Sequence, residues 1–401
     1  MLFPLQIKGY KGLMSTLKMA AKIVPMPKPV LFTGPGSSLE LCEAIAQMET
    51  QRVMIVTDSM LMKIGLLKDI VKTLNQNGVE TAIFDGVLPD PTYEHIESGL
   101  VFLKKNNCDA ILAVGGGSSI DAAKIIAAGA TNTKPIRKMA GMFRVSKAPL
   151  PFFAIPTTAG TGSEVTIGAV VSDPVTHHKE LLIDPKLVPM MAALDASLMT
   201  GLPASITSAT GMDALTHAIE AYLSMNASKE TDAYALAATR LITQNLPLVM
   251  KNGQDLIARQ NMSQASYYAG LAITKAGLGY VHAISHNFGA HYGTPHGLGN
   301  SIVLPYVLDY SINASSSRLA KLAEVSGLKK GAESDLELAQ KFIDYIRSML
   351  KEFGIPEQLD SLQKSDISSI AKAALKEAHY NYAVPKYMDQ SNCEDLLNKM
   401  V

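Results

Sequence analysis

Four of the nine histidines in this 401-residue chain fall within fifteen consecutive residues: His282, His286, His291 and His296. An upstream helix-like stretch, GMDALTHAIEAY (211–222), adds Asp213 and His217, which are four residues apart. Neutral imidazoles and carboxylates are the ligands that bind first-row divalent metals in enzymes. Side chains at i and i+4 share one helix face, so Asp213 and His217 can bind one ion. These residues predict a mononuclear metal centre with nitrogen and oxygen ligands.

The spacing alone does not decide which of the clustered histidines bind the metal. His282 and His286 are themselves an i, i+4 pair, and His296 lies beyond the turn at Gly293–Pro295. A single histidine is more often a surface or satisfied core residue than a ligand. Four of them in one short segment, together with the separate Asp-x-x-x-His pair, favour a metal site over structural histidines.

A glycine-rich turn in the first half of the chain is a candidate phosphate site. The segment DAILAVGGGSSIDAAKIIAAGAT (109–131) has the pattern of a strand, a glycine turn and a helix. Three residues of the turn have no Cβ and let the backbone approach a ligand closely: Gly115, Gly116 and Gly117. Ser118 is expected to cap the helix, with Asp121 three residues on, where free N–H groups attract phosphate oxygens. The pattern differs from G-x-G-x-x-G, and a simple tight turn is the alternative.

A second loop of small residues, IPTTAGTGSEVT (155–166), offers hydroxyls at the end of another predicted strand: Thr157, Thr158 and Thr161. Ligands of open α/β sheets bind where strands end, so two such loops together favour a nucleotide. Asp58 ends the run VMIVTD, where a carboxylate can accept hydrogen bonds from ribose hydroxyls and would repel a 2′-phosphate. Asp58 therefore favours NAD over NADP, and capping of the next helix is the alternative role.

The elements that position these side chains follow an alternating pattern in the first half of the chain. Apolar runs predict strands at 29–34, 52–58, 80–86, 109–116 and 151–158, with helix-like segments such as 39–48, 66–78 and 93–107 between them. Continuous apolar strands separated by amphipathic helices indicate a parallel, doubly wound, Rossmann-like sheet. Strand signals fade after about Ser205, and long helical patterns follow, such as 231–250 and 334–354. We expect an N-terminal arm (1–28), an α/β domain (29–204) and an all-helical domain (205–401).

Composition narrows the class of protein. The chain is 47% hydrophobic and 18% charged, which is typical of a compact enzyme rather than a disordered chain. Lys+Arg and Asp+Glu each number 36, so the net charge suggests neither nucleic acid nor an anionic membrane as a partner. The three scattered cysteines form neither a disulfide framework nor a thiolate metal pattern, which favours a reducing compartment, the cytoplasm.

The N-terminal arm is basic. Residues 1–39 contain five lysines and no acidic residue, and no apolar run in the chain approaches the length of a membrane span. A targeting peptide is one interpretation, but the arm lacks arginine and a signal-type apolar block. We favour a solvated arm that docks on the protein or on a partner subunit.

The motifs together resemble the iron-containing (group III) alcohol dehydrogenase family, from about Pro29 to the C-terminus. The resemblance rests on four segments in order: GGGSSIDAAK, PTTAGTGSEVT, LDASLMTGLPASITSATGMDALTHAIEAY and VHAISHNFGAHYGTPHG. It implies a dehydroquinate synthase-like architecture, with a dinucleotide-binding domain followed by a helical domain. It also implies that the metal ligands are Asp213, His217, His282 and His296. His286 is then a non-ligand near the substrate that transfers a proton, and His291 is structural.

By the same resemblance, NAD is expected to contact six residues: Asp58, Gly117, Ser118, Thr157, Thr161 and Lys179. Two departures from the family pattern are visible. The usual Asn-Pro-Thr turn is Asp90-Pro91-Thr92 here, and the C-terminal loop that often ends in Asn-Pro has Val384-Pro385 in that place. His379, in the same loop, is expected opposite His286 in the substrate pocket. Gly168 adds no side chain near the expected nicotinamide, so small linear and medium-chain alcohols are expected.

The implied function is a metal-dependent oxidoreductase that transfers a hydride between a primary alcohol, or its aldehyde, and NAD. Three imidazoles and one carboxylate leave a position on the metal, Fe²⁺ or alternatively Zn²⁺, for the substrate oxygen. A homodimer or larger assembly is expected. One alternative is a dehydroquinate synthase-like lyase, but the helical half shows no Lys/Arg cluster for a phosphorylated substrate around the histidine segment. The other is a non-catalytic metal- or nucleotide-binding protein, which would be expected to lack a ligand.

Overall fold

The computed structural model describes residues 3–21, 26–173 and 179–401, which form two compact units. The sheet unit takes Pro25–Leu202 and also Gln254–Tyr267. The helical unit takes Pro203–Gly253 and Tyr268–Val401, together with the N-terminal helix α1 (Phe3–Ala21). The division falls between Leu202 and Pro203, two residues before the boundary expected between residues 204 and 205. The return of 254–267, the first half of helix α9 (Leu256–Ala276), to the sheet unit was not expected from the sequence.

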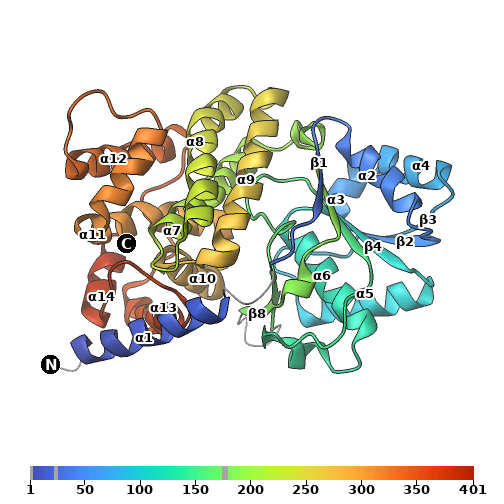
Figure 1. Ribbon diagram of the computed structural model, residues 1–401, viewed down its shortest axis with the longest axis horizontal. Helices are drawn as coiled ribbons and strands as arrows, with labels where there is room; N and C mark the ends of the chain where they lie inside the picture. The colour runs from blue at the N-terminus through green and yellow to red at the C-terminus, as the bar shows by residue number, and fades with distance from the viewer. Residues whose placement is uncertain (1–2, 22–25, 174–178) are drawn as a thin grey trace. The chain divides into compact units, whose positions relative to one another are not determined.

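The sheet unit contains a six-stranded parallel sheet in the order β1-β9-β6-β4-β2-β3 (Figure 1). The prediction of a parallel, doubly wound sheet is confirmed. All six residues of β4 are buried, as expected for a strand covered on both faces. The strands are β1 (Val30–Thr33), β2 (Arg52–Val56), β3 (Glu80–Phe84), β4 (Ala110–Gly115), β6 (Phe152–Pro156) and β9 (Met191–Leu194).

Helices cover both faces of this sheet, because alternate residues of β4 enter two different cores. Ile111 and Ala113 pack with side chains of α5 and α6, whereas Leu112 and Val114 pack with side chains of α2 and α4. Besides the first half of α9, the α-helices of this unit in the described residues are α2 (Ser37–Ala46), α3 (Ser59–Lys63), α4 (Lys68–Gln76), α5 (Tyr93–Lys105) and α6 (Gly117–Thr131).

The strand order reverses between β2 and β4, because the chain leaves β2 for β3 on one side and then returns to pair β4 on the other. Asp58 follows β2, and the glycine turn 115–117 follows β4. Residues at the carboxyl ends of these neighbouring strands form the topological switch point, where ligands of such sheets bind.

A second sheet of three strands, in the order β5-β8-β7, belongs to the same unit and was not predicted. Strand β7 (Gly168–Ser172) pairs antiparallel with β8 (Lys179–Ile183), and β5 (Gly141–Met142) pairs parallel with β8. Residue 168 thus begins one strand and residue 179 the other.

The helical unit contains no strand within its described residues, in agreement with the expected all-helical second half. It includes the second half of α9 and the remaining helices: α7 (Ala204–Leu223), α8 (Lys229–Lys251), α10 (Tyr280–Tyr292), α11 (His296–Val325), α12 (Asp335–Glu352), α13 (Ile367–Asn381) and α14 (Gln390–Asn398).

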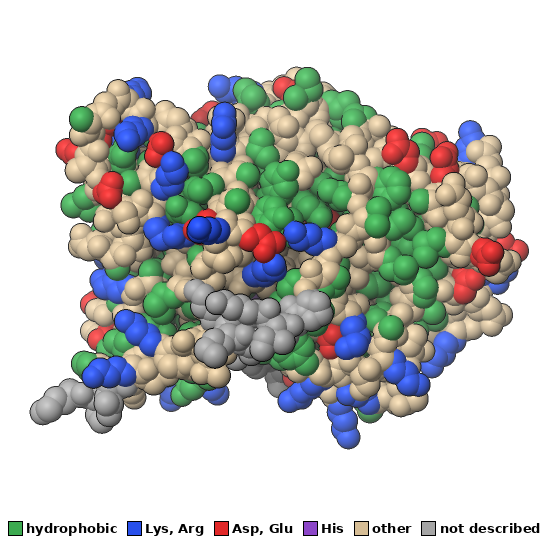
Figure 2. All heavy atoms as spheres, in the orientation of Figure 1, with side chains coloured by type: hydrophobic (Ala, Val, Ile, Leu, Met, Phe, Trp, Pro, Cys, Tyr) green, Lys and Arg blue, Asp and Glu red, His purple; other side chains and the backbone are tan. Residues whose placement is uncertain are grey.

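Helix α1 lies along α13 (Figure 1), where the ring of Tyr10 packs on the ring of His379 at a centroid distance of 4.7 Å. The arm was predicted to dock on the protein or on a partner, and its described helix contacts its own chain through Phe3 and Tyr10. None of the described helices is both long enough and apolar enough to cross a membrane. Basic and acidic side chains are interspersed on the face that Figure 2 shows, in keeping with the net charge of zero.

Candidate active site

Helix α7 positions the first two predicted ligands. It begins after Pro203, and its Ala- and Leu-containing sequence runs to Leu223 without a helix breaker other than Gly211. Asp213 and His217 are both buried on one face, with Asp213 Oδ1 3.9 Å from His217 Nε2. The i, i+4 spacing therefore places the two side chains on one face of the helix.

Glycines at the ends of α10 and α11 allow the histidine segment to reach α7. Helix α10 ends at Tyr292 and is capped by Gly293, whose φ of 65° is left-handed, and Pro295 precedes His296, the first residue of α11. A Cβ on Gly297 would lie only 2.4 Å from the carbonyl oxygen of Ala209 in α7. The first turn of α11 can therefore pack against the backbone of α7 only because residue 297 is glycine.

The structure brings together all four predicted ligands, and their ligand atoms lie within 4.8 Å of one another: Asp213, His217, His282 and His296. His282 Nε2 is 3.8 Å and His296 Nε2 is 3.6 Å from Asp213 Oδ1. Only His296 of the four is partly exposed. This is the group that the family resemblance selected among the clustered histidines.

The other two clustered histidines lie outside this group. The ring of His286 packs beside two ligand rings, with its centroid 5.4 Å from that of His296 and 5.9 Å from that of His282. His291 is exposed at the end of α10, where its Nδ1 is 3.0 Å from the carbonyl oxygen of Asn287. His286 is thus beside the centre, and His291 is away from it.

His282 has the protonation state that a metal ligand needs. Burial, and then the neighbouring imidazoles, hold its pKa well below the usual value for histidine, so the ring is neutral. Its Nδ1 lies 2.6 Å from Glu220 Oε2. With the Nδ1 proton donated to a carboxylate, Nε2 carries the lone pair that a metal binds.

Glu220 is a functional residue that the sequence analysis missed. Its carboxylate also accepts hydrogen bonds from the backbone N–H groups of Gly279 (2.9 Å) and Val281 (2.7 Å), at the N-terminus of α10. A Cβ on Gly279 would lie 2.8 Å from Glu220 Oε1, so a larger residue there would displace this carboxylate. Burial raises the pKa of Glu220 to about 8, although these hydrogen bonds oppose the rise. Both oxygens accept backbone N–H groups, which favours the ionised form, and a cation in the centre would favour it further.

Asn300, which the sequence did not single out either, contacts the predicted ligands. Its contacts indicate that the ligand atoms need a hydrogen-bond donor or a cation. Its amide Nδ2 lies 2.7 Å from Asp213 Oδ1, 3.1 Å from His282 Nε2 and 3.2 Å from His296 Nε2. Its Oδ1 is buried and has no hydrogen-bond partner among the described residues. Three electron-rich atoms thus converge on one N–H₂ group, at the cost of leaving the amide oxygen unpaired. A divalent cation with nitrogen and oxygen ligands fits such a donor set.

In the sheet unit, the glycine turn and the threonine loop pack closely. A Cβ on Gly117 would lie 2.6 Å from Thr161 Cγ2, and one on Gly116 would lie 3.4 Å from Thr158 Oγ1. The N–H of Thr157 donates to the carbonyl oxygen of Gly115 at 3.0 Å. The two predicted loops therefore form one continuous surface at the ends of β4 and β6.

The expectation that Ser118 caps helix α6 is wrong, because the helix begins at Gly117, two residues earlier than a cap at Ser118 would require. Gly116 is the N-cap, and no side chain caps this end within the described structure. Asp121 does not serve as the capping partner either: it is buried and accepts hydrogen bonds from Ser163 Oγ (3.0 Å) and the N–H of Val170 (2.9 Å). Asp121 thus holds the threonine loop in place through its hydrogen bond with Ser163. The first N–H groups of α6 have no side-chain cap among the described residues.

Asp58 and Lys179 each make a contact inside the sheet unit. Asp58 is the N-cap of α3, with Oδ1 accepting from the N–H groups of Met60 and Leu61. The capping role considered for Asp58 is therefore present, and it uses one carboxylate oxygen. Lys179 Nζ lies 2.7 Å from Asp90 Oδ1, so the aspartate that departs from the family turn pairs with a predicted NAD contact.

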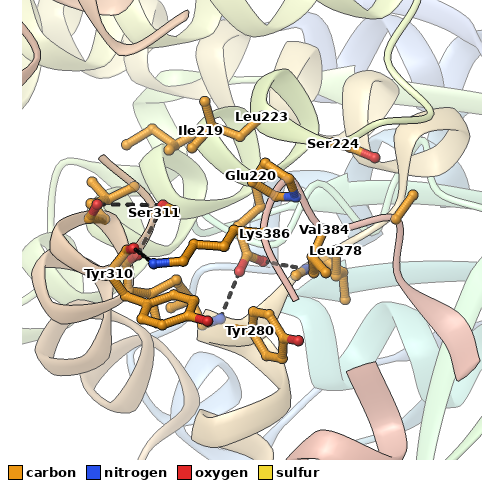
Figure 3. A pocket seen from close by; sticks show the side chains of 16 residues that line it. Ile219, Glu220, Leu223, Ser224, Leu278, Tyr280, Tyr310, Ser311, Val384 and Lys386 are labelled. Carbon is orange, nitrogen blue, oxygen red and sulfur yellow. Dashed lines mark hydrogen bonds between the residues drawn. The ribbon is translucent and has the colours of Figure 1, made fainter. Parts of the chain in front are cut away.

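Glu220, the partner of His282, also lines an apolar pocket (Figure 3). Val384, Pro385 and Lys386 of the C-terminal loop line it, and Lys386 Nζ bonds the carbonyl oxygen of Tyr310 at 2.9 Å. None of the four predicted ligands lines this cavity. With about 30 Å³, it has room for about two water molecules, so it is a void behind the ligands rather than a substrate site.

The expectation that His379 faces His286 is wrong. His379 is buried, and its Nε2 lies 2.9 Å from Tyr280 Oη and 3.0 Å from the carbonyl oxygen of Met388. The residue of α13 that reaches His286 is Glu377, two positions earlier, at 2.8 Å. At Gly168, as expected, a Cβ would meet no atom within 4 Å.

Comparisons with known proteins agree with this geometry. Residues 27–196 match the family described as "Iron-containing alcohol dehydrogenase", and residues 207–401 match "Fe-containing alcohol dehydrogenase family, C-terminal". The NAD-dependent methanol dehydrogenase of Bacillus methanolicus is 39% identical over 87% of this chain and 92% of its own length.

Two solved structures have the same fold. A 1,3-propanediol oxidoreductase superposes with a TM-score of 0.91 at 36% identity, covering 94% of this chain and all of the other. A sulfoacetaldehyde reductase from Bifidobacterium kashiwanohense, solved with NAD⁺, has a TM-score of 0.84 at 26% identity, covering 94% of this chain and 98% of the other. Sequence, fold and the grouping of the metal-binding side chains lead to one conclusion: the chain belongs to the iron-containing alcohol dehydrogenase family.

Proposed function

We propose that the protein transfers a hydride between a small primary alcohol, or its aldehyde, and NAD, with a divalent metal in the helical unit. The observation that carries this proposal is the group of ligand atoms within 4.8 Å of one another: Asp213, His217, His282 and His296. Fe²⁺ is the first candidate for the metal and Zn²⁺ the second, because both accept imidazole and carboxylate ligands.

A bound metal would supply Lewis acidity towards the substrate oxygen, and NAD would accept the hydride. The chain's own residues prepare this chemistry. Burial keeps His282 neutral, Glu220 holds its Nδ1 proton, and Asp213 balances positive charge. His286, which packs against the ligand rings without joining them, is proposed to take up the proton that the alcohol loses.

The proposed NAD site lies in the sheet unit at the switch point of the sheet. The glycine turn (Gly116, Gly117) and the uncapped start of α6 at Ser118 are proposed to face the phosphates, beside Thr157, Thr158 and Thr161. Asp58 is proposed to accept from the ribose, and Lys179 to contact the cofactor. Asp121 is proposed to act indirectly, through the loop that it supports.

The proposed substrate class rests on the names of related enzymes and on the open space beside Gly168. Relatives are named for methanol and for 1,3-propanediol, which are both small primary alcohols. The absence of a side chain at Gly168, where a Cβ would meet nothing, is compatible with small linear and medium-chain alcohols. We also propose a homo-oligomer, at least a dimer, in the cytoplasm; the three cysteines are buried free thiols, as a reducing compartment permits.

The test begins with elemental analysis of anaerobically purified protein. The protein is then given NAD and a panel of primary alcohols, and NADH formation is followed by absorbance. We expect about one iron or zinc per chain, loss of activity on chelation, and recovery when the metal is returned. A metal-replete protein that reduces no NAD with any alcohol, and oxidises no NADH with the aldehydes, would refute the function.

Variants of the ligands test the metal site separately. Replacement of Asp213, His217, His282 or His296 by Ala is expected to remove most of the metal and activity, whereas His291→Ala should spare both, because His291 is exposed and outside the group. Full metal occupancy in a folded His282→Ala protein would overturn the ligand assignment.

A further inference from the structure

Two histidines of α10, one helical turn apart, are each paired through Nδ1 with a carboxylate from a different helix. His282 Nδ1 lies 2.6 Å from Glu220 Oε2 of α7, and His286 Nδ1 lies 2.8 Å from Glu377 Oε1 of α13. An ionised carboxylate can only accept, so the imidazole must donate from Nδ1. In a neutral ring, Nε2 then carries the lone pair.

Glu377 is itself held in place. The hydroxyl of Tyr382 donates to Glu377 Oε1 at 2.6 Å, and Tyr382 is buried. Burial raises the pKa of Tyr382 well above its usual value, so the group remains a phenol that donates. The carboxylate of Glu377 thus accepts from His286 and from Tyr382, and Tyr382 is buried.

The surroundings of His286 differ from those of the ligands. Its ring is nearly parallel to that of His296, at an interplanar angle of 18°, and its side chain is 17% exposed. It therefore lies at the accessible edge of the centre, where an imidazole can exchange a proton with substrate and then with solvent.

We propose that Glu377 is a positioning residue that holds His286 in its Nδ1–H tautomer, so that Nε2 receives the proton of the alcohol. In this step the alcohol O–H bond breaks and the Nε2–H bond forms, while the hydride goes to NAD in the activity proposed above. The resulting imidazolium is stabilised by the adjacent carboxylate, and its Nε2 proton then passes to water. The kinetic part of this inference rests on the proposed function; the tautomer does not.

The kinetic experiment uses the metal-loaded full chain and a double-mutant cycle. Glu377→Leu is expected to lower kcat by about ten- to a hundredfold, part of the effect of a general base. KM and metal content should stay within about twofold of the parent. Glu377→Gln, which keeps an acceptor but loses the charge, should give an intermediate kcat. Glu357→Leu is the matched control, because Glu357 is exposed in the same unit and its side chain lies outside the site.

The decisive comparison is made in the His286→Ala protein. There, Glu377→Leu should cause no further loss beyond about twofold, because the group that it positions is absent. An equal loss in both backgrounds, or loss of metal from Glu377→Leu, would show a structural role and overturn the proposal. Full kcat in His286→Ala would overturn it too, while leaving alcohol oxidation by the parent intact.

The tautomer of His286 can be measured directly, without any enzymatic activity. In zinc-loaded protein labelled with ¹⁵N-histidine, at mildly alkaline pH, the His286 signals are assigned by their disappearance in His286→Ala. We expect a protonated Nδ1 in the parent and in Glu357→Leu, and a mixture or the Nε2–H form in Glu377→Leu. An unchanged tautomer in Glu377→Leu would refute the proposal, even if the protein oxidised alcohols. The expected change would support it, even if no alcohol were oxidised.

Discussion

At the residue scale, side chains outside the group of predicted metal ligands orient those ligands. Glu220 fixes the tautomer of His282 and also satisfies two N–H groups at the start of α10. A carboxylate can accept all three hydrogen bonds, because both of its oxygens are acceptors. An amide at the same position would present one N–H₂ group to a neighbouring donor.

Glu220→Gln is therefore expected to weaken metal binding by about ten- to a hundredfold, the usual effect of losing such a partner. The conflict of buried donors should also lower the free energy of unfolding by about 1–3 kcal/mol. Titration with zinc or iron against a competing chelator measures the affinity, and Glu352→Gln, at an exposed position of α12, is the control. Unchanged metal affinity in a folded Glu220→Gln protein would contradict this role.

Asp58 has two functions to separate at the same scale. It caps α3, and it is expected to repel the 2′-phosphate of NADP. Asp58→Asn keeps a good capping side chain but removes the charge, whereas Asp58→Gly removes both. We expect Asp58→Asn to lower the preference for NAD over NADP by about tenfold, ~1.4 kcal/mol, with little loss of stability. The ratio of kcat/KM for the two cofactors measures this, and a parent that prefers NADP would refute it.

At the scale of elements, the site depends on positions where two segments can pack closely because one of them has a glycine at the contact. Gly117→Ala would place a Cβ 2.6 Å from Thr161 Cγ2, so the turn after β4 and the loop after β6 would have to separate. We expect a loss of about 1–3 kcal/mol in the free energy of unfolding, together with weaker NAD binding.

Calorimetry and NAD titration of Gly117→Ala check this expectation. Gly201→Ala is the matched control, because a Cβ there meets nothing within 4 Å. Adding Thr161→Gly to Gly117→Ala should recover stability, since it removes the clashing atoms. If Gly117→Ala were as stable as Gly201→Ala, the packing of the two loops would not be the reason for the glycine.

The elements that the sequence predicted are those recognisable from a short run of neighbouring residues. The apolar strands β2, β4 and β6 and the i, i+4 pair Asp213 and His217 belong to this class. Strand β9 was missed, because MAAL has four residues and no β-branched side chain. The partners of the site were missed for another reason: Glu220, Asn300 and Glu377 are polar residues within helices, and only tertiary contact shows what they face. Glu220 did leave a weak signal, its position three residues after His217 on the same helix.

At the scale of the whole molecule, the two edges of the large sheet differ. Strand β3 carries Glu80 at its start, which pairs with Arg52, so this edge is charged. Strand β1 has the sequence VLFT without a charge, and Val30 is 62% exposed. An uncharged edge strand presents unpaired backbone groups to a second chain, whereas charged residues discourage such pairing. This contrast supports association through the N-terminal strands.

We therefore expect the protein to sediment as a dimer or a larger assembly at micromolar concentration. Val30→Lys places a charge on the β1 edge and should shift the equilibrium towards the monomer, because a buried lysine in the interface would lack a partner. Val101→Lys is the matched control: Val101 is 66% exposed on α5, where its neighbour Phe102 packs on Phe84 of β3, the edge opposite to β1, and the assembly should survive. A parent that sediments as a fully active monomer would reject the dimer, and a dimer that both variants retain would place its interface on another surface.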